Sequence, residues 1–197
     1  MGNTSQPVSP ENKRLAQYIA EAFGGTPHVN RYDHDTEPLS VSILHSADRP
    51  SAGITSYSTI RLSDYSMFRG DKEFPTRIEI AGACKTNERN FPNVLAAAAF
   101  CIMRTKKFCH PGGVFSGYVR EFIKATTVPH LYFTTPFLWE QKLKTLELPT
   151  KTVTWVLAMG ISEEEFNYLD EKGAESLETA FEEQQIDIFD LKRRSVI

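Results

Sequence analysis

A stretch of fifteen residues, GITSYSTIRLSDYSM (53–67), carries eight hydroxyl-bearing side chains. Such a density occurs around catalytic nucleophiles, and also in strands, where Thr and Tyr fit a pleated surface. Two further patterns bear on catalysis: Asp64 and Glu79 are a candidate acid–base pair, and the thiol of Cys109 beside His110 is a candidate nucleophile. However, catalytic Cys and His normally meet through the fold, and the chain has no G-x-S-x-G elbow. We therefore expect no catalytic residue. An enzyme is the third hypothesis, after two in which the chain acts by binding another protein.

Metal and cofactor sites are not expected either. The five histidines are scattered, and no pair has the spacing of a helical ligand site. The segment HDTE (34–37) can chelate a cation loosely, but an exposed polar loop explains it better. Neither glycine pair, Gly24-Gly25 or Gly112-Gly113, begins a phosphate-binding loop.

Composition limits the class of protein. With 197 residues, 41% hydrophobic and 24% charged, the chain is typical of a globular protein. A net charge of −3 argues against nucleic acid as the main partner. Three cysteines without a CxxC indicate a reducing compartment, and the longest apolar run, Val94 to Met103, is too short to cross a membrane. The polar N-terminus has no signal-peptide pattern, so we expect a cytoplasmic protein without a membrane partner. The sequence does not determine the oligomeric state.

Hydrophobic periodicity predicts the elements that position these residues. A helix over 10–23 follows an N-cap at Ser9, and a second helix, beginning near Pro92, is apolar almost all round, which indicates burial. Ser162 and Glu165 form a capping box for the first of two C-terminal helices. Strands are expected at 39–46, which reads as half-buried, and at the further segments 54–62, 77–85, 114–119, 130–135 and 152–160.

This order predicts an α+β fold: a mixed, largely antiparallel sheet packed with a buried central helix and a C-terminal helical pair. We expect residues 1–8 to be flexible and residues 9–197 to form a single domain.

The C-terminal region is strongly acidic. Residues 163–183 contain nine acidic side chains against one basic residue, Lys172, and Asp187 and Asp190 extend the series. One interpretation is a solvated helical face. The other is a negative patch that steers a basic protein partner. The following LKRRS (191–195) offsets part of the charge, either locally or as a C-terminal anchor.

Eight segments, which run through nearly the whole chain in order, carry a resemblance to a known family. They are AFGGTP (22–27), ADRP (47–50), GITSYSTIRLSDYSM (53–67), FPNVLAAAAFCI (91–102), HPGGVF (110–115), PFLWE (136–140), KTVTWVLAMGIS (151–162) and QIDIFDLKRRSVI (185–197). Through them the chain resembles the Suppressor-of-fused domain family, and most of all its bacterial branch, whose members include antitoxins or immunity proteins of secreted polymorphic toxins. It implies a compact α/β sandwich that binds other proteins and has no catalytic machinery. In one departure, Arg61 stands where the family tends to have glycine.

Two binding hypotheses follow from the resemblance. The leading one is an immunity protein that binds and neutralises a cognate toxin, expected to be basic or nuclease-like. The alternative is a regulatory module that sequesters an endogenous protein by adding a β-strand to a sheet edge. The hydroxyls of residues 53–67 are then architecture, with Ser63 and Asp64 bonding to backbone in an LSDY turn. Expected partner contacts are Arg61, Ser63, Asp64, Tyr65, Glu171, Glu175, Glu178, Glu182, Asp187 and Asp190.

Overall fold

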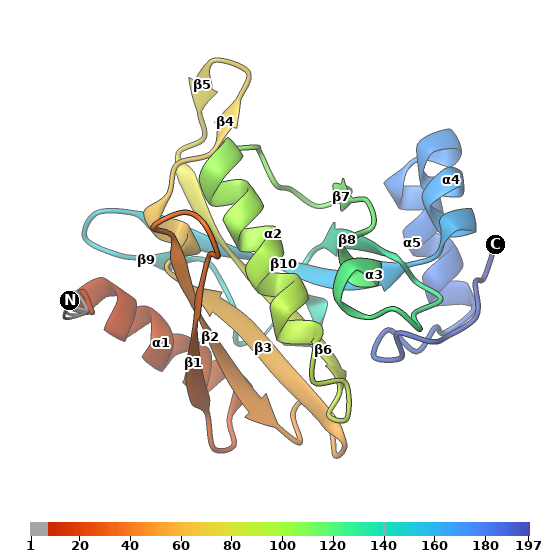
Figure 1. The fold of residues 1–197 in the computed structure, drawn as a ribbon, viewed down its shortest axis with the longest axis horizontal. Coiled ribbons are helices and arrows are strands. Elements are labelled where there is room, and N and C mark those ends of the chain that lie inside the picture. The colour runs from red at the N-terminus through yellow and green to blue at the C-terminus, as the bar shows by residue number, and fades with distance from the viewer. Residues whose placement is uncertain (1–7, 140) are drawn as a thin grey trace.

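The computed structural model describes residues 8–139 and 141–197, so most of the segment expected to be flexible, residues 1–7, lies outside the described residues. An eight-stranded sheet forms the centre, with strand order β1-β2-β3-β6-β10-β8-β7 and β9 added beside β10 (Figure 1). Its strands are β1 His28–Asp33, β2 Ser40–Ala47, β3 Ile54–Ile60, β6 Thr76–Lys85, β7 Val114–Phe115, β8 His130–Thr134, β9 Leu146–Glu147 and β10 Thr152–Ile161. A separate two-stranded hairpin consists of β4 Phe68–Arg69 and β5 Lys72–Glu73.

The sheet is mixed and largely antiparallel, as predicted. Strands β6 and β10 pair in parallel, from Thr152 opposite Thr76 to Ala158 opposite Gly82. The other named strand pairs are antiparallel.

Helices cover both faces of this sheet. They are α1 Pro10–Phe23, α2 Phe91–Thr105, α3 Tyr118–Phe122, α4 Glu163–Lys172 and α5 Ala174–Glu183, with 3-10 turns η1 Leu62–Asp64 and η2 Phe137–Trp139. As predicted, Ser9 caps α1 by accepting a hydrogen bond from the Asn12 N–H at 3.1 Å, and α2 is the buried central helix. Figure 1 shows α2 crossing one face of the sheet, with α4 and α5 beyond the end of β10.

Strand β2 is buried on both faces, which corrects the expectation of a half-buried strand at 39–46. Ile43 packs in the core that contains α2, whereas its neighbour Leu44 packs in the core that contains α1. All seven residues of β3 are buried. The hydroxyls of β3 are therefore interior groups that need hydrogen-bond partners.

The C-terminal segment is pinned to the fold by a buried ion pair. Arg193 donates to both carboxylate oxygens of Glu165, at 2.5 and 2.7 Å, and to the Gly160 carbonyl at 3.1 Å. Glu165 also completes the predicted capping box with Ser162. The basic segment after the acidic helices thus acts as an anchor, one of the two roles considered from the sequence.

The strand expected at 114–119 is shorter than predicted. It ends at Phe115, and Gly117, with φ of 79°, is the N-cap of the short helix α3. The left-handed conformation of Gly117 turns the chain, and this ends the strand early.

Candidate protein-binding surface

The predicted contacts at residues 61–65 lie at one corner of the sheet, and most of their polar groups are already bonded within the chain. The Asp64 carboxylate accepts hydrogen bonds from Lys151 Nζ at 2.5 Å and Asn12 Nδ2 at 2.9 Å. Arg61 Nη1 donates to Ser40 Oγ at 2.9 Å, and Arg61 Nε lies 3.8 Å from Asp64. The expectation that the Asp64 side chain bonds to backbone is wrong, because side chains from α1 and from the start of β10 reach it. We call Arg61, Ser63, Asp64 and the groups bonded to them the Asp64 corner.

Ser63 offers no surface for a partner in this structure. It is 1% exposed, and its backbone N–H donates to Glu79 Oε1 at 3.0 Å. Thr59 donates to the other oxygen of Glu79 at 2.6 Å. The Ser63 hydroxyl itself is buried without a partner among the described residues. Expected contact Tyr65 is half-buried against the core on the α2 side. The surface proposed below therefore does not include Ser63.

Arg61, at which the resemblance led us to expect glycine, has a backbone conformation that suits glycine. Its φ is 87°, in the left-handed region that glycine adopts without steric cost. The glycine-like geometry is kept here with an arginine, whose side chain then reaches Ser40.

The candidate catalytic groups are poorly placed for chemistry. Glu79 is fully buried, and this burial raises the pKa of its carboxyl group, whereas Asp64 is paired with Lys151. Burial raises the pKa of the Cys109 thiol to about 12, so the reactive thiolate is scarce at neutral pH. This arrangement supports a non-enzymatic role.

Metal ligation is not indicated by the described residues, among which no three His, Cys, Asp or Glu side chains come together. In the HDTE segment, His34 Nδ1 accepts hydrogen bonds from the backbone N–H groups of Thr36 and Glu37, at 3.3 and 3.2 Å. That nitrogen is therefore used in the turn itself. In the same described part of the chain, no helix is long and apolar enough to cross a membrane.

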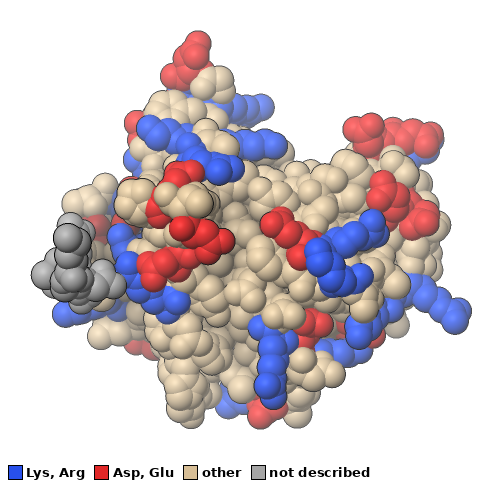
Figure 2. All heavy atoms as spheres, in the orientation of Figure 1, with Lys and Arg blue, Asp and Glu red and all other residues tan. Residues whose placement is uncertain are grey.

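The acidic C-terminal residues divide into paired and unpaired groups. Asp187 and Asp190 both contact Lys85 Nζ, at 3.4 and 2.6 Å, and the hydrogen bond from Lys85 lowers the pKa of Asp190. These two predicted contacts are committed to holding the C-terminal segment against β6. Glu171 lies 2.7 Å from the adjacent Lys172, and Glu175 is exposed on α5. Figure 2 shows acidic side chains gathered over α4, at the upper right of that view.

Two further predicted contacts, Glu178 and Glu182, line a hollow between α5 and the end of β8. The Tyr132 hydroxyl donates to Glu178 Oε1 at 2.8 Å, and the Thr134 hydroxyl donates to the same oxygen at 2.6 Å. The hollow has a volume of about 370 Å³. Its other lining residues are mostly apolar: Thr135, Phe137, Met159, Phe181, Gln185, Ile186 and Ile188. We call it the α5 hollow.

Phe137 is a member of this surface that the sequence did not single out. It is 47% exposed and is the only exposed aromatic residue in the described part of the chain. The segment FLW (137–139) is uniformly apolar, and only the fold decides that Trp139 turns inward while Phe137 turns outward. Exposed aromatic residues beside a pocket are enriched at the energetic centres of protein interfaces.

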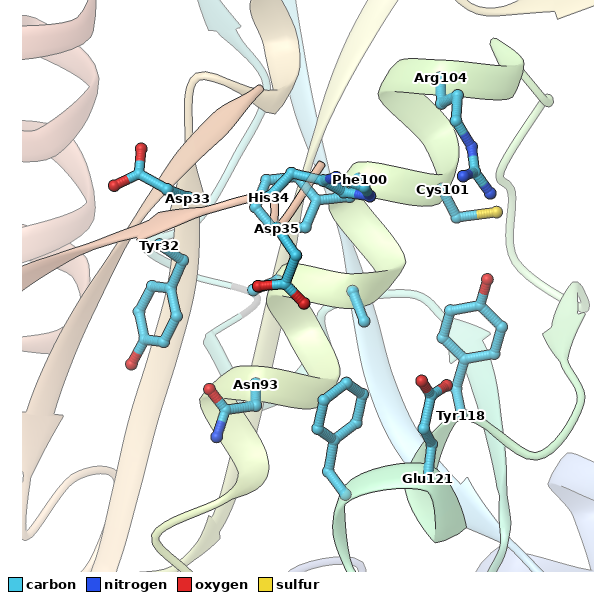
Figure 3. A pocket seen from close by; sticks show the side chains of 13 residues that line it. Tyr32, Asp33, His34, Asp35, Asn93, Phe100, Cys101, Arg104, Tyr118 and Glu121 are labelled. Atoms are coloured by element: carbon cyan, nitrogen blue, oxygen red, sulfur yellow. The ribbon is translucent and has the colours of Figure 1, made fainter. Parts of the chain in front are cut away.

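A second hollow of about 300 Å³ lies along the exposed side of α2, and we call it the α2 groove. Figure 3 shows Tyr118 of α3 near Cys101 of α2, and His34 and Asp35 near Phe100. The ring of His34 packs edge-on against Phe100, with centroids 5.2 Å apart. At this groove Arg104 Nη1 lies 3.5 Å from Glu37 Oε1, so the positive charge of Arg104 is paired with a carboxylate of the same chain.

Comparisons with known proteins agree on one family. The profile of the family "Suppressor of fused protein (SUFU)" matches residues 35–194. The chain is 41% identical over 190 residues to "Immunity protein YqcF" of Bacillus subtilis (strain 168), covering 96% of this chain and 99% of the relative.

Solved structures share the fold at low sequence identity. A putative SUFU homologue from Neisseria gonorrhoeae FA 1090 superimposes with a TM-score of 0.73 at 15% identity, covering 94% of this chain and 96% of the homologue. The structure described as the Sufu-Fu complex matches with a TM-score of 0.67 at 14% identity, covering 95% and 92% of the two chains. Drosophila Suppressor of Fused matches with a TM-score of 0.63 at 12% identity, covering 96% of this chain and 54% of that one.

Proposed function

The chain belongs to the Suppressor of fused protein family, and from that premise we propose that it is an immunity protein that binds and neutralises a cognate toxin. The observation that carries the proposal is the 41% identity to Immunity protein YqcF, which extends over 96% of one chain and 99% of the other. Similarity over the full length favours a shared mode of action more strongly than a shared fold does. The resemblance noted from the sequence predicted the same family and role.

The toxin's contact surface is expected to be basic. Exposed carboxylates at Glu171, Glu175 and Glu182 lie on α4 and α5, and α5 itself contains no basic residue. A field of one sign steers an oppositely charged partner and raises the association rate. Association with the toxin should therefore slow as the salt concentration rises. We propose that this capture takes place in the cytoplasm of the cell that the protein protects.

The proposal is tested by capture followed by protection. The tagged chain is used to recover partners from an extract of its native host at low and moderate salt, and stoichiometric partners are identified by mass spectrometry. We expect a partner whose toxin domain arrests growth when expressed alone and does not when this chain is expressed with it. An endogenous regulator as the stoichiometric partner, or a toxin that still kills in the presence of this chain, would contradict the proposal.

The alternative, a regulatory module that captures a strand, has one structural feature in its favour. Strand β1 lies at the edge of the sheet, pairs with β2 alone, and exposes Val29 to 51%. An open edge of this kind accepts an extended peptide. A short peptide that suffices for binding would favour this alternative, whereas a requirement for a folded toxin domain would favour the immunity role.

A further inference from the structure

The floor of the α5 hollow is apolar and comes from three separate parts of the fold. Met159 lies on β10, Phe181 on α5, and Ile186 and Ile188 in the segment after α5. Phe181 is held from behind by Arg193, whose guanidinium carbon lies 5.5 Å from the ring centroid. Arg193 is in turn bonded to Glu165, so Phe181 is tied to the anchored C-terminal segment.

The rim of the hollow carries two carboxylates with oxygen atoms that can still accept hydrogen bonds from a partner. Glu178 is oriented by two hydroxyl donors that both use its Oε1, and among the described residues no hydrogen bond or ion pair occupies its Oε2. Glu182, one helical turn further along α5, is exposed and has no such contact with the described residues. Residues four apart lie on the same face of a helix, so the two carboxylates border the hollow together.

Phe137 forms an aromatic part of the wall of the hollow. It follows β8 in η2, and it is the exposed aromatic residue described above. The hollow thus places an aromatic ring, an apolar floor and two carboxylates around one space of about 370 Å³.

We propose that the α5 hollow receives an arginine side chain of the toxin; this rests on the proposed function and names its central contact. The methylene stem would cover the apolar floor, and the guanidinium would lie against Phe137 while it donates to Glu178 and Glu182. Arginine fits better than lysine because its planar fork can bind two carboxylates and stack on a ring. The ring of Phe137 would stack on the planar guanidinium, and the carboxylates of Glu178 and Glu182 would accept its hydrogen bonds.

The test is isothermal titration calorimetry of the captured toxin domain with the full chain and three variants. We expect Glu182→Gln and Phe137→Ala each to weaken binding by about tenfold or more, the range of buried charge pairs and aromatic contacts at interface centres. Glu183→Gln is the matched control, because it removes the same charge from the next residue of the same helix but does not line the hollow. It should leave Kd within about twofold. Equal Kd values for the full chain, Glu182→Gln and Phe137→Ala would overturn the proposal.

Growth protection is measured in parallel, so that a failure of the immunity role can be distinguished from a failure of the arginine contact. If the full chain protects cells and the hollow variants bind as tightly as it does, the immunity role stands and the arginine contact is wrong. If no toxin is captured, the immunity role fails, and the hollow is examined by NMR titration with Nα-acetylarginine methylamide. Shifts confined to the residues of the hollow, absent in Glu182→Gln and absent with the norleucine analogue, would support the arginine site. No shifts, or equal shifts with norleucine, would overturn it.

Discussion

The Asp64 corner and the α5 hollow look alike in the sequence and differ in the structure. Both are rich in acidic and hydroxyl side chains, and both were expected to contact a partner. At the corner, Asp64 is bonded to Lys151 and Asn12, and Glu79 is enclosed. At the hollow, Glu182 has no hydrogen bond or ion pair within the described chain. We infer that an exposed charge without a partner among the described residues, such as that of Glu182, is a better candidate for a binding contact than a charge that is already paired.

The largest effect is expected where the hollow depends on an internal ion pair. Arg193→Met leaves Glu165 buried without its cation, and removal of one partner from such a pair costs about 3–5 kcal/mol. Chemical denaturation measures this loss, and toxin binding should weaken with it because Phe181 loses its support. Unchanged stability would show that the C-terminal segment is not held by this pair. Lys192→Met, on an exposed neighbour, is the control and should change stability by less than about 0.5 kcal/mol.

Lys151→Met should destabilise the Asp64 corner without touching the binding surface. The Lys151 side chain is 8% exposed and Asp64 is 35% exposed, so the lost contact is worth about 1–2 kcal/mol after allowance for solvent screening. Toxin affinity should stay within twofold. A large loss of toxin affinity in a folded Lys151→Met variant would indicate that the Asp64 corner contacts the toxin. Lys13→Met, an exposed lysine of α1, provides the matched control.

Arg61 allows a comparison of two substitutions at the same corner. Both Arg61→Gly and Arg61→Ala remove the hydrogen bond to Ser40, but only glycine adopts a φ of 87° without steric cost. We expect Arg61→Gly to be more stable than Arg61→Ala by about 1 kcal/mol, as measured by urea unfolding. Equal stabilities would mean that the left-handed backbone carries no strain at this residue.

The smallest effect is a change in pH dependence at Glu79. Burial raises the pKa of this carboxyl group in the folded chain above its usual value of 4.5. The unfolded chain therefore loses its proton first, and stability contributed by this group is full below pH 4.5 and falls as the pH rises toward the folded pKa. Because Glu79→Gln has no titrating carboxyl group at this position, the decrease in the free energy of unfolding that Glu79 causes above pH 4.5 should disappear. An unchanged slope between pH 4.5 and 7 would show that Glu79 is ionised throughout.

Local patterns predicted the elements well because their determinants are close in the sequence. The Ser9 cap, the capping box of Ser162 and Glu165, and strand β10 each depend on neighbouring residues, and all are present. The mixed, largely antiparallel sheet was predicted from the element order and the family resemblance. Only the tertiary structure shows that β3 is buried on both faces, since that depends on α1 and α2 packing from opposite sides.

The binding residues were harder to predict, because pairing over long sequence distances decides which charges remain free. Lys85 reaches Asp190 across 105 positions, and Lys151 reaches Asp64 across 87. No local pattern indicates either contact. Likewise, nothing in PFLWE separates the exposed Phe137 from the buried Trp139.

The most direct test of the contrast measures stability and toxin affinity together for Lys151→Met and Glu182→Gln. Lys151→Met should lose about 1–2 kcal/mol of stability and keep its affinity, because it breaks an internal contact. Glu182→Gln should keep its stability and lose about tenfold in affinity, because in the unbound protein its carboxylate is exposed and bonds to none of the described residues. The opposite pattern, or parallel losses in both variants, would contradict the assignment of the corner to architecture and the hollow to binding.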